Sequence, residues 1–143
     1  ANFPELNKYY IAYDNKSFVF QNKRLKKIQT NKNVAFKNAK LTINTLHSLR
    51  SRKIIKYIMS FKGFFKVTGV DAYNFCSIAE GRFDILIESG LKIVDILPVL
   101  LIVQNSGAII TDWQGKNNFS KGQVLVSPNR KIHNYFLKIL KKA

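Results

Sequence analysis

The organisation of the chain is clearest in residues 68–115, TGVDAYNFCSIAEGRFDILIESGLKIVDILPVLLIVQNSGAIITDWQG. Within them, residues 70–81 and 95–107 predict helices, because each run is long and closed by a glycine. The first run places Ala72, Phe75, Cys76 and Ala79 on one face. Residues 83–89 and 108–113 are short and rich in β-branched side chains, which predicts strands. Strands that alternate with helices in this way are typical of an α/β fold, here a mixed sheet flanked by helices.

The second of these helices is expected to be buried, because residues 95–107 are almost entirely apolar. Asp95 is predicted as its N-cap, where a carboxylate accepts a free backbone N–H group. Pro98 then falls in the first turn, where proline is tolerated, and Gly107 stands at the C-terminal end.

Residues on either side extend the α/β pattern. A strand is predicted around residues 40–44, a basic amphipathic helix over 48–60 and a strand over 64–69. Another strand is predicted at 123–127, followed by a closing helix over 129–142. The first of these helices places Leu49, Ile54, Ile55 and Ile58 on one face, and the closing helix carries Lys in its last turn.

The N-terminal residues have a different pattern. Residues 9–13 and 18–20 are β-prone runs joined by DNKS, which predicts a hairpin, and NKRLKKI adds a second turn and strand. A hairpin alone is not stable and needs further strands. We therefore expect residues 1–31 to be a β-hairpin segment of a first sheet whose remainder is missing, and residues 32–143 to be a C-terminal α/β domain.

The chain is strongly basic, with 24 Lys and Arg against 8 Asp and Glu. Residues 1–70 carry 15 basic and 2 acidic side chains, a net charge of +13, whereas residues 71–112 carry 2 and 6, a net charge of −4. A basic surface suits a nucleic acid. However, 19 of the basic residues are Lys, and a Lys- and Asn-rich composition is also typical of AT-rich genomes. Neither a nucleic-acid partner nor genome composition explains the net negative charge of residues 71–112, the acidic segment of the chain.

Three residue types bear on compartment and chemistry. The single cysteine, Cys76, excludes an internal disulfide and lies on a predicted inward helix face. His47 and His133 lack companion metal ligands and are predicted to be surface or helix-face residues. The N-terminal residues lack an apolar leader, and the longest apolar run is too short to span a membrane. These features predict a soluble, cytoplasmic protein.

The acidic segment contains candidate site residues. Glu88 ends a predicted strand and Asp95 begins a predicted helix, which is where α/β sheets place ligands. Gly69 and Asp71 precede another helix and are compatible with either a simple helix start or a loop that binds a polar substrate. Carboxylates of this kind suit Mg²⁺, but one Asp and one Glu supply only part of a metal site.

The same residues carry a family resemblance. The matching features are Gly69 and Asp71 before AYNFCSIAEG, then GRFD, Glu88 in ESGLK, Asp95 seven residues later, and GAIITDWQG. Together they resemble the C-terminal half of the inositol monophosphatase family, in particular its histidinol-phosphatase-like branch. The resemblance implies the C-terminal half of a layered α/β/α/β/α sandwich. It also implies Mg²⁺-dependent hydrolysis of small phosphorylated alcohols.

Each site residue has an implied role. Asp95 matches a metal ligand, while Gly69, Asp71 and Glu88 match substrate-binding positions. Two family signatures are missing upstream of Phe3, an acidic metal-ligand pair and an Asp-Pro-x-Asp-Gly-Thr-like segment. The chain is therefore predicted to be inactive without an N-terminal half, with that half or a second copy as its partner. The alternative is a degenerate, non-catalytic basic protein that binds RNA or another protein.

Overall fold

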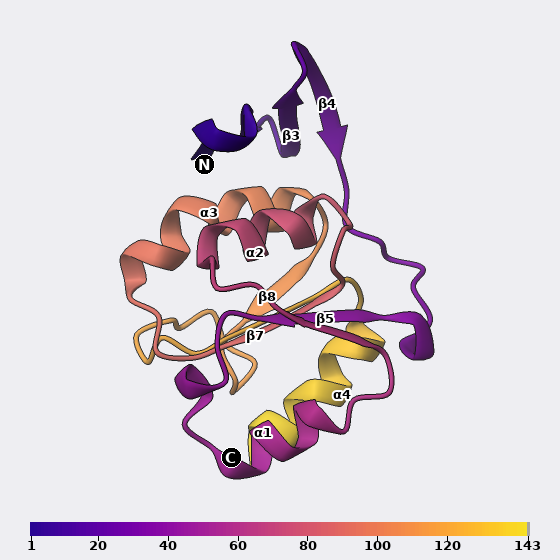
Figure 1. Ribbon diagram of the computed structural model, residues 1–143, viewed down its shortest axis with the longest axis vertical. Helices are drawn as coiled ribbons and strands as arrows, with labels where there is room; N and C mark the ends of the chain where they lie inside the picture. Colours follow the sequence, from indigo (N-terminus) through magenta and orange to yellow (C-terminus); the bar gives the residue numbers. More distant parts are fainter. Residues whose placement is uncertain (143) are drawn as a thin grey trace.

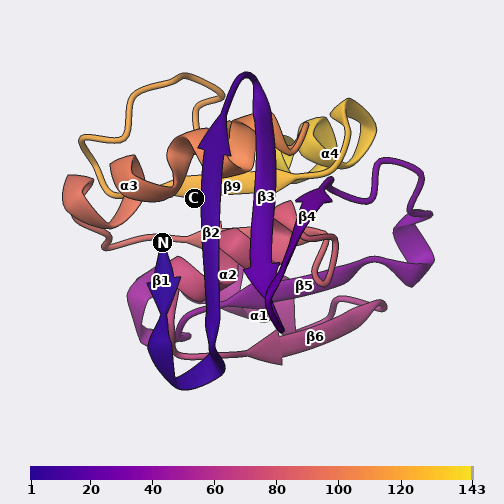
Figure 2. The ribbon, with the colours of Figure 1, turned by 90° about the horizontal axis from the view of Figure 1, so that it is seen from above.

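A computed structural model describes residues 1–142 and arranges them as two β-sheets separated and flanked by helices (Figures 1 and 2). From the top of Figure 1 downward, an N-terminal sheet lies over α2 and α3, these lie over a second sheet, and α1 and α4 lie beneath it. The mixed α/β fold predicted from the sequence is confirmed. The four layers correspond to all but the first helical layer of the sandwich that the resemblance implies.

The first sheet is antiparallel, with strand order β1-β2-β3-β4. Its strands are β1 (Asn2–Phe3), β2 (Lys8–Tyr13), β3 (Lys16–Gln21) and β4 (Arg24–Ile28). The predicted hairpin is β2–β3, which pairs from Lys8 with Gln21 to Tyr13 with Lys16. Its tight turn places Asp14 and Asn15 at positive φ, which these residue types tolerate, so the turn chemistry of DNKS fixes the register. Strand β1 was not predicted.

The second sheet has five strands in the order β6-β5-β7-β9-β8. They are β5 (Lys40–Ile43), β6 (Phe64–Val67), β7 (Ile85–Glu88), β8 (Ile109–Thr111) and β9 (Val124–Ser127). Strand β5 runs parallel to β6 and β7, while β9 runs antiparallel to both β7 and β8. The three parallel strands therefore end at the same edge of the sheet, and the helices that follow β6 and β7 start there.

Two apolar clusters hold the layers together. Helices α2 (Asp71–Ala79) and α3 (Ile93–Asn105) contribute to the cluster between the sheets, which also contains Tyr10 and Val19 from the hairpin. Helices α1 (Arg52–Met59) and α4 (Arg130–Leu140) build the other cluster, on the opposite face of the second sheet. No helix among residues 1–142 is long and apolar enough to cross a membrane.

Helix α3 differs from its prediction in two ways. It begins at Ile93, so Lys92 is the N-cap, Asp95 is the third helical residue and Pro98 the sixth. Asp95 Oδ2 accepts the backbone N–H of Lys92 at 2.8 Å, so the carboxylate still stabilises the helix start, but from inside the helix. The helix is also only partly buried: Val94 is 65% exposed and Leu101 60%.

Smaller differences concern connections. The helix predicted over residues 48–60 begins at Arg52, after a 3-10 turn that contains the buried Leu49. The strand predicted over residues 108–113 ends at Thr111, and the link between β8 and β9 runs over residues 112–123. Within this link, Asp112 Oδ1 accepts the backbone N–H groups of Gln114 and Lys116, so the carboxylate holds the turn in place. Cys76 is fully buried, as predicted.

His133 lies in helix α4, as the helix-face alternative of the prediction allows, but it is not a surface residue. The ring is 4% exposed and lies between two hydroxyl groups, with Nδ1 2.7 Å from Ser127 Oγ and Nε2 2.9 Å from Thr111 Oγ1. Burial, with a smaller contribution from the charge of Arg130, lowers the pKa of His133 to about 4. A neutral imidazole therefore belongs to the core of the chain.

This burial predicts acid sensitivity. Because the folded pKa lies below the unfolded value, protonation favours the unfolded chain progressively as the pH falls from about 6.5 towards 4. We expect His133→Gln, which keeps a neutral polar side chain, to flatten the dependence of the urea midpoint on pH across this window. An unchanged slope in the variant would contradict this account of His133.

Candidate active site

The candidate site lies where the parallel strands β5, β6 and β7 end. Asn44 follows β5, Thr68 and Gly69 follow β6, and Glu88 is the last residue of β7. Helices α2 and α3 start at the same edge, with Asp71 first in α2. The carboxyl edge of such strands is where open α/β sheets bind ligands. The structure thus brings three predicted acidic residues to the same region.

Glu88 is the most deeply buried of them, with no exposed surface. Its Oε1 accepts a hydrogen bond from the Asn74 amide at 3.4 Å, while Oε2 has no partner within residues 1–142. Burial, followed by repulsion from Asp71, raises the pKa of Glu88 to about 8, although hydrogen bonds from Asn44 and Asn74 act in the opposite direction. This carboxyl group is held largely neutral at physiological pH unless a cationic group approaches it.

Asp71 is half-buried at the first position of α2. Burial and then the charge of Asp95 raise the pKa of Asp71, and a hydrogen bond with Asn44 partly offsets this. Its Oδ1 is buried without a partner in the described part of the chain. Asp71 therefore links the other two acidic residues electrostatically. The charge of Asp95 raises the pKa of Asp71, and the charge of Asp71 in turn raises the pKa of Glu88.

Gly69 lies at φ +75°, and a Cβ placed there would meet nothing within 4 Å. The site is therefore open in front of this backbone, although a side chain would strain it. Asp95 is half-buried in the first turn of α3, where its Oδ2 accepts the bond from Lys92. The backbone conformation of Gly69 and the free space suit close approach of a ligand.

The loop between Glu88 and α3 is held by contacts from distant segments. Ser89 Oγ donates to the backbone oxygen of Ser48, and the backbone N–H of Leu91 donates to the oxygen of Gly122 at 3.2 Å. Gly122 has φ +64°, and a Cβ there would lie 2.1 Å from the Leu91 oxygen. Only glycine permits this approach, which fixes the loop that separates Glu88 from Asp95.

Two site residues were not identified from the sequence. Asn74 is fully buried, and its Oδ1 accepts from Thr68 Oγ1 and, at 3.5 Å, from Thr42 Oγ1. It thereby ties the ends of β5 and β6 to Glu88. An amide on the otherwise apolar inward face of residues 70–81 was the signal for Asn74. No pattern in the sequence indicates Asn44, because its contacts with Glu88 and Asp71 form only when the strands pair.

The acidic residues have the right chemistry for a hard cation, which prefers oxygen ligands. Their number is insufficient, because no group of three or more His, Cys, Asp or Glu side chains in residues 1–142 is arranged to hold a metal ion. The described chain therefore supplies part of a donor set, and any complete metal site needs ligands from elsewhere.

The amino-acid sequence is similar to those of known proteins. A model of the inositol monophosphatase family matches residues 1–143. Over 147 residues the chain is 29% identical to a putative Nus factor SuhB of Neisseria meningitidis, covering 96% of this chain and 53% of that protein. A chloroplastic bifunctional phosphatase of Arabidopsis thaliana is 44% identical over 48 residues, 34% of this chain and 14% of its own length.

Solved structures show the same fold. The extragenic suppressor protein suhB of Bartonella henselae has a TM-score of 0.70 at 19% identity, over 90% of this chain and 53% of that one. An IMPase of Thermotoga maritima has a TM-score of 0.69 at 19% identity, over 89% of this chain and 52% of its own. The chain thus spans about half the length of the first relatives it matches.

Proposed function

Because this chain belongs to the inositol monophosphatase family, we propose that it is the C-terminal portion of a Mg²⁺-dependent phosphatase of small phosphorylated alcohols. In this proposal an N-terminal half supplies the remaining metal ligands, and the 143-residue chain alone is inactive. Asp95 is the metal ligand of this portion. Glu88, Asp71 and Gly69 bind the part of the substrate remote from the phosphate.

The observation that carries the proposal is that two buried carboxylate oxygens at this edge of the sheet, Asp71 Oδ1 and Glu88 Oε2, have no partner within residues 1–142. A third such oxygen, Asp84 Oδ1, lies at the opposite end of β7 and is not part of the site. Unpaired buried carboxylates are costly, and natural proteins retain them where a ligand completes their bonding. Hydroxyl or amino groups of a substrate are donors that fit both oxygens. The raised pKa values of Asp71 and Glu88 are likewise typical of functional sites.

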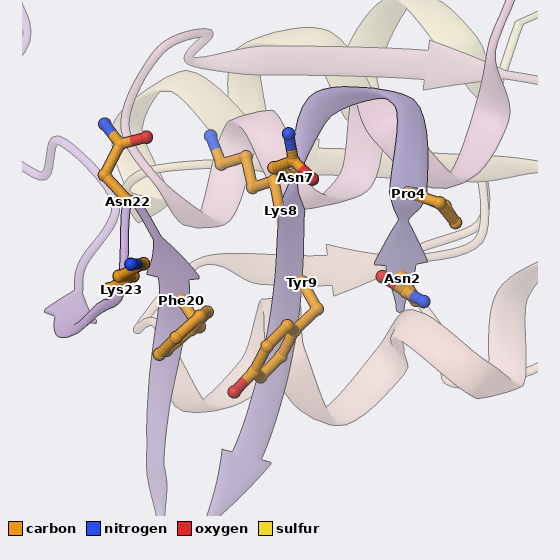
Figure 3. A pocket seen from close by; sticks show the side chains of 8 residues that line it. All are labelled: Asn2, Pro4, Asn7, Lys8, Tyr9, Phe20, Asn22 and Lys23. Atoms are coloured by element: carbon orange, nitrogen blue, oxygen red, sulfur yellow. The ribbon is translucent and has the colours of Figure 1, made fainter.

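A second observation supports the need for an N-terminal half. The outward face of the first sheet is covered by nothing among residues 1–142, and Figure 2 looks directly onto it. Tyr9 and Phe20 stack there with ring centroids 4.7 Å apart beside an open hollow of about 500 Å³ (Figure 3). Tyr13 is 55% exposed on the same face. Such an aromatic surface is typical of an interface.

The edge of this sheet is also incomplete. Strand β2 pairs with β3 over six positions but with β1 over only two, Asn2 with Tyr9 and Phe3 with Lys8. The edge of β2 beyond Tyr10 therefore offers backbone groups to a further strand.

Helix α3 provides a further surface that residues 1–142 leave uncovered. This surface is an apolar stripe near Asp95, formed by Val94, Leu97 and Leu101.

The residues of this chain would position the substrate rather than cleave it. Glu88, held by Asn74, and Asp71 would orient the alcohol, since fixed geometry lowers the entropic part of the barrier. Mg²⁺, when bound, polarises a phosphate and lowers the pKa of a water molecule. Asp95 would contribute one carboxylate oxygen to that ion, while its Oδ2 keeps α3 in place through Lys92.

The proposal is tested by complementation. The 143-residue chain is co-expressed with an N-terminal half that carries the missing acidic pair and Asp-Pro-x-Asp-Gly-Thr-like segment. Phosphate release from inositol phosphate and from histidinol phosphate is then measured with and without Mg²⁺. We expect activity only from the combined protein in Mg²⁺. Asp95→Asn, which keeps an acceptor for Lys92, should lower kcat/KM by about 100-fold or more, as expected for loss of a metal ligand.

Asp14→Asn is the matched control, because Asp14 lies in the exposed hairpin turn and pairs only with exposed Lys16. It should leave kcat/KM unchanged. Full activity of the 143-residue chain alone, or activity of the combined protein that survives Asp95→Asn, would overturn the proposal.

A further inference from the structure

The outer helical layer carries positive charge without any acidic residue. Residues 50–62 and 130–142, which contain α1 and α4, hold five Lys or Arg each, and no Asp or Glu occurs in residues 15–70 or 113–143. All ten basic side chains are exposed: Arg50, Arg52, Lys53, Lys56, Lys62, Arg130, Lys131, Lys138, Lys141 and Lys142. None of them forms an ion pair within residues 1–142.

A groove concentrates this charge between the two helices, which lie side by side beneath the second sheet (Figure 1). It measures about 530 Å³ and is lined by residues of both helices and their ends: Lys53, Lys56, Tyr57, Ser60, Lys138, Ile139 and Lys142. The four lysines provide point charges, while the hydroxyl hydrogens of Ser60 and Tyr57 are donated within the chain, to the backbone oxygen of Tyr57 and to the hydroxyl of Tyr135. Such a lining suits a chain of phosphates better than a single neutral ligand.

The helices offer little to a lipid bilayer. Their apolar faces are turned into the core, where Ile54, Ile58, Ile132 and Phe136 are buried. Interfacial helices bind membranes by inserting such faces. In α1 and α4, Met59 and Tyr135 are the only large apolar or aromatic side chains that are exposed, which is far less than an inserting face. An aromatic ring is nevertheless present at the rim, because Tyr135 is 43% exposed and its hydroxyl accepts a hydrogen bond from Tyr57. Lysines beside an exposed aromatic ring are typical of surfaces that bind single-stranded nucleic acid.

The position of the groove matters as well. It lies on the opposite face of the second sheet from α2 and α3, whereas the uncovered face of the first sheet lies beyond those helices (Figure 1). A partner that completes the first sheet would therefore leave α1 and α4 accessible. From these observations we propose that the groove between α1 and α4 binds the sugar–phosphate backbone of a single-stranded nucleic acid. This activity is independent of phosphate hydrolysis.

The test is fluorescence anisotropy with an unstructured single strand of about 12 nucleotides, as RNA and as DNA, at about 50 to 200 mM salt. The groove variant K53Q/K56Q/K138Q/K142Q should bind at least about tenfold more weakly, and its plot of log affinity against log salt should be less steep by about 3. The control variant K16Q/K23Q/K26Q/K27Q removes the same charge from exposed positions of β3, β4 and their connecting turn. It should bind like the parent chain.

Circular dichroism of both variants establishes that each is folded. Equal loss in the two variants would mean that only net charge matters, and this outcome would overturn the proposal, as would undetectable binding of both strands at the lowest salt. Vesicles that contain phosphatidylserine provide the third arm. Groove-dependent binding to vesicles but not to either strand would assign the surface to lipid and contradict the inference. A preference for RNA over DNA, or the reverse, would support it and identify the strand.

Discussion

Glu80→Ala is expected to lower the free energy of unfolding by about 3–5 kcal/mol, because it leaves a buried ammonium group without its partner. Lys8 is 2% exposed, and its Nζ lies 2.6 Å from Glu80 Oε2. The same oxygen accepts the hydroxyl of Tyr10 at 2.7 Å and pairs with Arg82 at 3.0 Å. This cluster joins β2 to the end of α2, so its loss should loosen the first sheet from the helices below.

Burial alone would raise the pKa of Glu80, but the hydrogen bonds from Lys8 and Tyr10 and the charges of Lys8 and Arg82 lower it below its usual value. A lowered folded pKa means that the pair stabilises the chain above the unfolded pKa. This stabilisation is lost as the pH falls through the folded value. The loss caused by Glu80→Ala should therefore be large at neutral pH and smaller in strong acid.

Urea denaturation of the parent chain and the variant measures this effect. Asp14→Asn is the control, since Asp14 and Lys16 form an exposed pair that should contribute less than about 1 kcal/mol and Asn tolerates the positive φ of this position. The double variant Lys8→Met, Glu80→Leu removes both charges and should recover most of the lost stability. If Glu80→Ala costs no more than Asp14→Asn, the cluster does not hold the first sheet.

Glu88→Gln is expected to have the opposite effect and to stabilise the chain, by roughly 3 kcal/mol at pH 7. The folded pKa of about 8 lies above the usual 4.5, so folding favours the neutral carboxyl group. The contribution of Glu88 to stability is present below pH 4.5 and is lost as the pH rises towards 8. Glutamine keeps the neutral form at every pH and retains an acceptor for Asn74.

The stability of the parent chain should therefore fall between pH 4.5 and 8 by an amount that the variant does not show. Urea midpoints at several pH values measure this difference, and Glu5→Gln, at an exposed position, is the control. Identical slopes in the parent chain and Glu88→Gln would contradict the account of this site. In the combined protein, the same variant should raise KM, because glutamine has a single oxygen and cannot accept from Asn74 and from a substrate donor with two separate oxygens, as Glu88 can.

Much of the fold could be predicted because local chemistry and the final packing agree. DNKS favours one tight turn, and the glycines at 81 and 107 end α2 and α3 at positive φ. The start of α3 was misplaced for a local reason. Asp is a residue type that favours the N-cap position, which is why Asp95 was predicted there. In the structure, Ile93 and Val94 extend the helix into solvent, and the Asp95 carboxylate accepts the backbone N–H of Lys92 instead.

The features that escaped prediction depend on residues far apart in the chain. Asn44 approaches Glu88 only after β5 and β7 pair, and His133 becomes buried only after α4 covers the hydroxyls of Thr111 and Ser127. Strand β1 is two residues long and exists only through its register with β2. Periodicity cannot reveal such contacts, since each is created by tertiary packing.

The strand order of the second sheet also determines when each strand gains its neighbours during synthesis. Strand β9 lies between β7 and β8, although it follows both in the chain. While a ribosome is still producing Val124–Ser127, β8 has no neighbour and the edge of β7 stays open. The nascent chain therefore exposes apolar strands until β9 emerges, and chaperones that shield such edges can bind in this interval.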